Sequence, residues 1–169
     1  MKESIVNRVA QSPLVVIDLE DFYDNIPRFQ VDIAEWLEEG LILREQPFRE
    51  ALKQKDWSIF QNTYVAIYCS TDAIIPAWAS MLVASYLAPV ALKVGYGNIE
   101  ALDSSIFQTI IETIDYAQYS GRPVIVKGCS NKPIPTTAFI QLIEKLRPIA
   151  KSVMFGEACS SVPLFKNNK

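Results

Sequence analysis

From Tyr64 onward, short apolar runs alternate with stretches whose apolar residues recur at helical spacing. A strand that is followed by a helix and then by another strand is typical of parallel pairing through right-handed crossovers. The predicted strands cover Tyr64–Tyr68, Ala91–Tyr96, Pro123–Val126 and Ser152–Phe155. The predicted helices cover Ala77–Leu87, Asp103–Ala117 and Thr136–Leu146. We therefore expect a doubly wound α/β fold, with a mainly parallel sheet between two helical layers.

The first third of the chain is less regular. Leu14–Ile17 is predicted as a strand, and Phe29–Ile33 as a second strand that pairs back as a hairpin. Short helices are expected over Ala34–Glu39 and Pro47–Lys55. We expect one domain over residues 1–169, with residues 1–62 as a hairpin and helix extension on a core of residues 63–169. The extension is expected to cover a sheet edge or to mediate dimerisation.

Composition limits the chemistry and the partners. The 169 residues have a net charge of −3 and include no histidine. The acidic balance argues against nucleic acid as a partner, and the missing imidazole excludes Ser-His and Cys-His nucleophile pairs. Ala73–Leu92 contains no charged residue, but Pro76 and Pro89 bound it, which favours a buried helix over a membrane span. An odd cysteine count without a secretion signal predicts a cytoplasmic protein with reduced thiols.

Three cysteines each stand in a Cys-Ser pair after a predicted strand, with a proline a few residues later. They are Cys69, Cys129 and Cys159. In a parallel sheet all strands end at one edge, where ligands bind. If the four predicted strands lie in the order 2-1-3-4, the three strands that precede the cysteines are neighbours. The thiols are then expected to converge at that edge.

Converging thiols predict a metal site that binds zinc, iron or an iron–sulfur cluster. Three thiolates leave a fourth position, for which the candidate carboxylates are Asp18, Asp21, Asp72 and Glu157. Two alternatives stay open. The cysteines can be buried packing residues of a non-catalytic interaction or scaffold protein, or a thiol at a helix N-terminus can serve redox chemistry. The sequence assigns no catalytic residue and leaves open whether the protein is an enzyme.

Several motifs together resemble a known family. They are Ile5-Val6-Asn7-Arg8-Val9-Ala10, Leu41-Ile42-Leu43-Arg44-Glu45, Phe48-Arg49-Glu50, Cys69-Ser70 through Ile74-Ile75-Pro76, Lys127-Gly128-Cys129-Ser130, and Gly156-Glu157 with Cys159-Ser160. The chain resembles the "domain of unknown function 2480" family, found mainly in Bacteroidetes. The resemblance implies a single-domain cytoplasmic bacterial protein without an established activity. It also implies a link to iron–sulfur cluster assembly, so the expected partners are an iron–sulfur assembly protein or a second copy, with no membrane.

Overall fold

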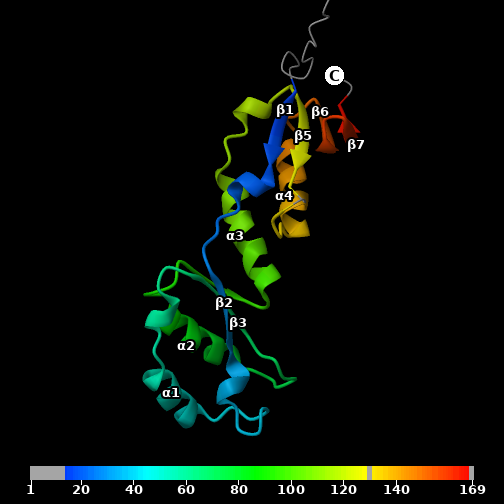
Figure 1. Ribbon diagram of the computed structural model, residues 1–169. Coiled ribbons are helices and arrows are strands. Elements are labelled where there is room, and N and C mark those ends of the chain that lie inside the picture. Colours follow the sequence, from blue (N-terminus) through cyan, green and yellow to red (C-terminus); the bar gives the residue numbers. More distant parts are fainter. Residues whose placement is uncertain (1–13, 129–130, 168–169) are drawn as a thin grey trace, which may run out of the picture. The chain divides into compact units, whose positions relative to one another are not determined.

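The computed structural model describes residues 14–128 and 131–167, which fall into two compact units. Unit 1 combines the described residues up to Tyr23 with those from Gln108 onward, and unit 2 runs from Asp24 to Phe107. Each unit has its own mostly parallel sheet with helices (Figure 1). The expected α/β class is therefore confirmed.

Unit 2 holds the three-stranded parallel sheet β2-β3-β4. The strands are β2 (Arg28–Asp32), β3 (Tyr64–Tyr68) and β4 (Lys93–Tyr96), and the helices are η2 (Ile33–Trp36), α1 (Glu45–Gln54), η3 (Ser58–Phe60) and α2 (Ala77–Leu87). Val65 and Ile67 lie two residues apart and so point to one face of the sheet. They share a core with Phe48 of α1 and Val83 of α2. Both helices therefore cover the same face of this sheet.

Unit 1 holds the four-stranded sheet β1-β5-β6-β7. Its strands are β1 (Val15–Asp18), β5 (Pro123–Lys127), β6 (Ser152–Glu157) and β7 (Ser160–Lys166), with η1 (Leu19–Phe22), η4 (Ala117–Tyr119) and α4 (Thr136–Leu146). The first three strands are parallel, and β7 returns antiparallel to β6 through a tight turn. Phe139 of α4 packs edge-on against Phe155 of β6. The boundary between the units falls within α3 (Ile99–Thr113).

The two units repeat one another at a constant displacement of 59 positions, as between Tyr64 and Pro123, the first residues of β3 and β5. The same displacement carries α2 onto α4, residue for residue. Strand register repeats as well, because Val65 pairs with Val94 and the equivalent Val124 pairs with Val153. Identical residues at equivalent positions are Asp56/Asp115, Val65/Val124, Ile75/Ile134, Pro76/Pro135, Ala79/Ala138, Leu87/Leu146, Pro89/Pro148, Ala91/Ala150, Val94/Val153 and Gly97/Gly156.

The turns before the central strands repeat too. Asn62 and Gly121 occupy equivalent positions, and both adopt left-handed backbone angles, with φ of 57° and 67°. Each N–H donates to a carbonyl after the helix, from Asn62 to Val90 and from Gly121 to Ile149, both at 2.9 Å. The chain thus folds twice into one βαβ plan, and β2 and β1 supply the third parallel strand of each sheet.

The expected arrangement of the strands needs three corrections. The strands do not form a single sheet in the order 2-1-3-4, because those at Tyr64 and Lys93 lie in one sheet and those at Pro123 and Ser152 in another. The strand expected over Phe29–Ile33 pairs parallel to β3 rather than as a hairpin. The antiparallel strand β7 was not expected at all. The single domain over residues 1–169 stays a prediction, as does the three-layer arrangement.

Candidate functional site

The loop after β3 is held by a carboxylate at the end of the neighbouring strand. Asp32 Oδ1 accepts hydrogen bonds from the backbone N–H of Ser70 at 3.0 Å and from that of Ala34 at 2.9 Å. Burial raises the pKa of Asp32, but hydrogen bonds from Ser70 and Ala34 outweigh it, so the pKa lies below its ordinary value. Thr71 Oγ1 lies 3.4 Å from Cys69 Sγ and donates to the carbonyl of Gly40 at 2.7 Å. Hydrogen bonds to Asp32 and to Gly40 therefore position the loop.

The predicted cysteine site is not assembled within the described residues. Cys69 follows β3 in unit 2 and is partly buried against its core, whereas Cys159 is exposed in the turn between β6 and β7 of unit 1. Cys129 lies outside the described residues. In the part of the chain that is described, no group of three His, Cys, Asp or Glu residues could hold a metal ion. The three-cysteine site stays a prediction.

The predicted carboxylates have other contacts. Asp18 Oδ1 accepts from the N–H of Glu20 at 3.0 Å and so caps η1. Glu157 forms an ion pair with Lys127 at 2.7 Å. The hydrogen bond to Glu157 raises the pKa of Lys127, although desolvation opposes it, and the nearby carboxylates add to the rise. Asp21 and Asp72 are exposed.

A small hollow lies at the carboxyl ends of β1, β5 and β6 in unit 1. Its polar lining includes Asp18, Glu20, Lys127, Asn131 and Glu157, and its volume is about 270 Å³. The carboxyl edge of parallel strands is where ligands bind in such sheets. The volume falls just below the roughly 300–1,000 Å³ of ordinary ligand pockets, and the Lys127–Glu157 ion pair occupies charges that a ligand would need. The hollow therefore does not carry a functional assignment.

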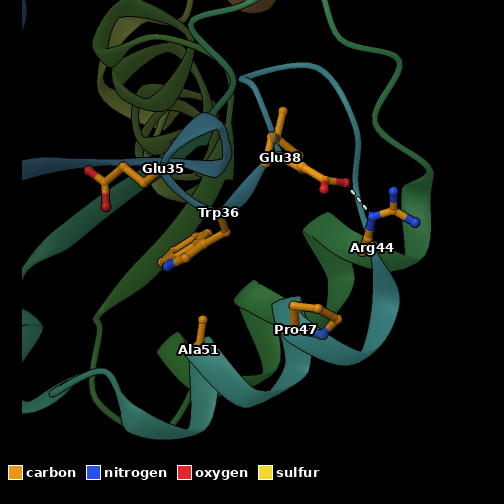
Figure 2. A pocket seen from close by; sticks show the side chains of 7 residues that line it. Glu35, Trp36, Glu38, Arg44, Pro47 and Ala51 are labelled. Atoms are coloured by element: carbon orange, nitrogen blue, oxygen red, sulfur yellow. Dashed lines mark hydrogen bonds and ion pairs between the residues drawn. The ribbon is translucent and has the colours of Figure 1, made fainter.

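A second, larger groove lies in unit 2 between the segment after β2 and helix α1 (Figure 2). It measures about 400 Å³, and Trp36, Leu37, Pro47 and Ala51 form most of its lining. Its charged residues pair with residues of the same unit. Glu38 pairs with Arg44, as the dashed line in Figure 2 marks, and Glu35 lies 3.8 Å from Lys55. The groove offers an aromatic and aliphatic floor, but its charges are already engaged.

Helix α2 presents an outward face without charge. This face, called the α2 face below, consists of Ala77, Met81, Ser85 and Ala88, all exposed. Met81 is 70% exposed, and Ile74 just before the helix is 95% exposed. The opposite side of the helix, with Ala79, Val83 and Leu87, is fully buried. The expectation that this helix is buried is therefore wrong for its outward side.

The repeat supplies a comparison for the α2 face. Helix α4 buries Ala138, Leu142 and Leu146, which are equivalent to the buried residues of α2. The residues equivalent to the α2 face are Thr136, Ile140, Glu144 and Arg147, all exposed. Surface helices usually carry polar residues on their outward side. At these four positions the second repeat carries Thr136, Glu144, Arg147 and the apolar Ile140, whereas the first carries only Ser85 as a polar residue.

In the described part of the chain, no helix has the length and apolar character needed to cross a bilayer.

The chain belongs to the family described as "Protein of unknown function (DUF2480)", whose sequence model matches residues 3–167. This confirms the resemblance given by the cysteine motifs. Comparison with curated proteins finds no match, and comparison with solved structures finds none either. Membership in this family assigns no activity.

The uncharged run from Ala73 to Leu92, which predicts a buried helix, also contains the signal for the α2 face. Uncharged residues from Ala73 to Leu92 are compatible with burial on all sides or with burial on one side and an apolar outward face. Comparing α2 with the displaced segment of α4 favours the second, because the buried positions are equivalent and Glu144 and Arg147 show that two of the outward positions accept charge.

Proposed function

We propose that the protein is an interaction protein that docks an apolar helix of a protein partner on the α2 face. The observation that supports this is the contrast between the two repeats at equivalent outward positions. Ser85 of α2 and Ala88, which caps it, occupy the positions equivalent to Glu144 of α4 and Arg147, which caps that helix. The two helices bury equivalent residues in equivalent βαβ units, but the residues on their outward sides differ in charge.

The exposed apolar residues supply the driving force for docking. Single exposed apolar residues are ordinary on protein surfaces, but contiguous apolar patches mark interaction sites. Burying a side chain such as Met81 or Ile74 stabilises a complex by about 1.5–3 kcal/mol, less the cost of ordering it. Met81 belongs to the α2 face and Ile74 lies just before the helix, and both stand in the run from Ala73 to Leu92 that carries no charge.

The remaining residues of the α2 face permit close approach of a second helix. Ala77 and Ala88 have small side chains, and helix axes pack about 8–10 Å apart depending on the residues between them. The hydroxyl of Ser85 donates to the carbonyl of Leu82 at 2.6 Å. Its donor is therefore satisfied within the helix, and an apolar partner can cover it without leaving that donor unpaired.

The test places a photoreactive residue at Ser85 or, as a matched control, at Glu144 in cells that produce the protein. A discrete covalent adduct is expected from position 85 and none from position 144. Adding Met81→Glu should abolish the adduct at position 85, because it places a charge in the apolar surface. Equal adducts from both positions, or an adduct that persists with Met81→Glu, would contradict the proposal.

A thiolate centre at Cys69, Cys129 and Cys159 is a separate prediction, in which the protein binds zinc, iron or an iron–sulfur cluster as an assembly accessory. Nothing among the described residues supports it. Its test is metal analysis of anaerobically purified protein beside the Cys129→Ala variant. The prediction is supported if the wild type contains one metal centre per chain and the variant contains none. Wild-type protein without metal would contradict it.

A further inference from the structure

We infer that unit 1 binds a small molecule with a primary ammonium group in a hollow between α3 and α4. The hollow, called the α3–α4 hollow below, has a volume of about 220 Å³. Its lining residues are Gln108, Ile111 and Glu112 of α3 and Gln141, Glu144 and Lys145 of α4. All of them belong to unit 1. The inference therefore concerns a different unit and a different kind of ligand from the docking proposed for the α2 face.

Each helix turns one face toward the α3–α4 hollow. The lining residues stand at positions i, i+3 and i+4 on both helices, counted from Gln108 on α3 and from Gln141 on α4. This spacing places three side chains on one face of a helix. Ile111 is buried, whereas Glu112 and Glu144 are exposed. The hollow thus combines a buried apolar residue with charged residues that solvent reaches.

The repeat contains an equivalent helix interface, between α1 and α2 of unit 2. There the indole Nε1 of Trp57 donates to the carbonyl of Leu52 at 2.9 Å. At the displacement of 59 positions, the hydroxyl of Tyr116 donates to the carbonyl of Ile111, also at 2.9 Å. The same hydrogen bond holds both interfaces, so the side chains between the helices can be compared position by position.

Unit 2 fills its interface with apolar side chains. The ring of Tyr86 stacks on Trp57 with the centroids 5.4 Å apart, and Leu82 packs against the core. The equivalent residues of unit 1 are Lys145 and Gln141. Lys145 is exposed and has no ring to take the place of Tyr86. The α3–α4 hollow lies where this replacement leaves room.

Gln141 carries a buried polar atom without a partner. Its Oε1 is buried, and no hydrogen bond reaches it from the described residues. A buried acceptor that is left unpaired is unfavourable. Leu82 shows that the fold accepts an apolar residue at this position, so packing alone does not require the glutamine. A ligand with an N–H donor would satisfy the oxygen.

The charges of the lining favour a cation. No ion pair joins Glu112, Glu144 or Lys145 to another residue in the described part of the chain. This differs from the hollow at the ends of β1, β5 and β6, where Lys127 and Glu157 pair with each other. Two carboxylates and one ammonium give the lining a net charge of −1. A primary ammonium group has three donors and no acceptor, so two carboxylates and the Gln141 oxygen can receive all three.

The volume limits the ligand to a short molecule. The α3–α4 hollow is smaller than the roughly 300–1,000 Å³ pockets that hold drug-sized ligands. One water occupies about 30 Å³ of liquid, so the hollow has room for about seven waters. A short aliphatic amine fits this space, and its alkyl chain can lie against Ile111.

The test is an NMR titration of the full chain at neutral pH, followed through the backbone amide signals of α3 and α4. Butylamine, which is protonated at this pH, is expected to shift signals around Gln141 in a saturable manner. Butanol lacks the charge and tetramethylammonium lacks N–H donors. Both are expected to bind at least about tenfold more weakly, because a hydrogen bond to a charged group is worth about that factor or more.

Variants that copy the residues of unit 2 test the position. Gln141→Leu, which copies Leu82, should weaken butylammonium binding more than about tenfold. It should also raise the melting temperature of the ligand-free protein by a few degrees, since it removes the unpaired oxygen. Lys145→Tyr, which copies Tyr86, should abolish binding by filling the hollow, although the loss of a positive charge would alone favour a cation.

Glu100→Gln lies in the part of α3 that belongs to unit 2 and serves as the control, with binding unchanged. Circular dichroism verifies that each variant is folded. Equal binding of butylamine and butanol, or butylammonium binding that survives Lys145→Tyr, would overturn the inference. Calcium that displaces butylammonium would assign the hollow to a metal ion instead, and the absence of any saturable shift with butylamine would remove the site.

Discussion

Arg28 carries a buried charge that joins three segments of unit 2. Its side chain is 9% exposed, and that of its partner Asp103 is 4% exposed. Arg28 Nε donates to Asp103 Oδ1 of α3 at 3.0 Å, and Nη1 donates to Asp24 Oδ1 at 2.9 Å. The hydroxyl of Tyr64 donates to the other oxygen of Asp24 at 2.7 Å. Buried charges persist only when they are paired in this way.

Removing one partner of this pair should destabilise the protein strongly. Asp103→Ala is expected to lower the free energy of unfolding by about 3–5 kcal/mol, because it leaves the Arg28 guanidinium buried with fewer partners. The double variant Arg28→Met with Asp103→Leu should lose less than the sum of the single variants, since it removes both charges together. Urea denaturation measures these differences. Strictly additive losses would show that the two charges are not coupled.

Asp32 predicts a pH dependence in the acid range. Its pKa is lower in the folded protein than in the unfolded chain, so its stabilising contribution is complete above the ordinary aspartate pKa of about 3.9. The contribution is lost as the pH falls through the lowered folded-state pKa. Asp32→Asn should therefore be less stable than the wild type at neutral pH, with a difference that shrinks below about pH 4. Urea denaturation along a pH series tests this, with Asp72→Asn in the following loop as the control.

At the scale of elements, sequence periodicity predicted three of the regular elements from Tyr64 onward at both ends. The strand Tyr64–Tyr68 and the helices Ala77–Leu87 and Thr136–Leu146 match the structure at both ends. Pro76 and Pro135 directly precede the two helices, and the polar Thr63 directly precedes the strand. Neighbouring residues in the sequence therefore determine where these elements begin. Helix α3 instead begins at Ile99, directly after Asn98, whose Oδ1 accepts from the N–H of Ala101 at 2.8 Å. Asp103 lies inside the helix, and its carboxylate pairs with Arg28. Local propensity does not contain that long-range contact.

The three Cys-Ser stretches suggested a shared site, but the repeat relates them differently. The segments that follow Cys69 and Cys129 in the sequence are equivalent in the 59-residue repeat, because Ile75-Pro76 corresponds to Ile134-Pro135. The cysteines themselves are displaced by one position, since Ser70 is equivalent to Cys129. Cys159 lies in the turn before β7. The three-stranded sheet of unit 2 has no strand equivalent to β7. Similar local sequence here reflects a repeated fold as much as a shared function.

The repeat predicts which substitutions a turn accepts. Gly121 adopts φ of 67°, and a Cβ built there would meet no atom within 4 Å. The equivalent Asn62 holds the same conformation with a side chain. Gly121→Asn is therefore expected to change the free energy of unfolding by less than about 0.5 kcal/mol, whereas Gly121→Val should cost about 1–2 kcal/mol because left-handed angles disfavour branched residues. Thermal and urea denaturation of the two variants decide this, and equal losses would contradict it.

At the scale of the whole molecule, chain order and spatial order differ. Unit 2 is a continuous stretch that is inserted between β1 and the rest of unit 1. The sequence pattern shows that a strand exists but not which strand it pairs with, since parallel pairing of β1 with β5 joins residues more than a hundred positions apart. The sequence therefore predicts most of the strands, but it does not predict which strands belong to which sheet.

The division into units predicts that stability is local to each unit. Leu87 of α2 and Leu146 of α4 occupy equivalent positions, and both are fully buried. Replacing either leucine with alanine should cost about 2–5 kcal/mol. Because the core around Leu87 is built from residues of unit 2, Leu87→Ala is expected to speed amide hydrogen exchange in β2, β3 and β4, with β1, β5 and β6 changing much less. Leu146→Ala should produce the reverse pattern. Exchange followed by mass spectrometry distinguishes the two, and equal acceleration in both sheets by either variant would show that the units open together.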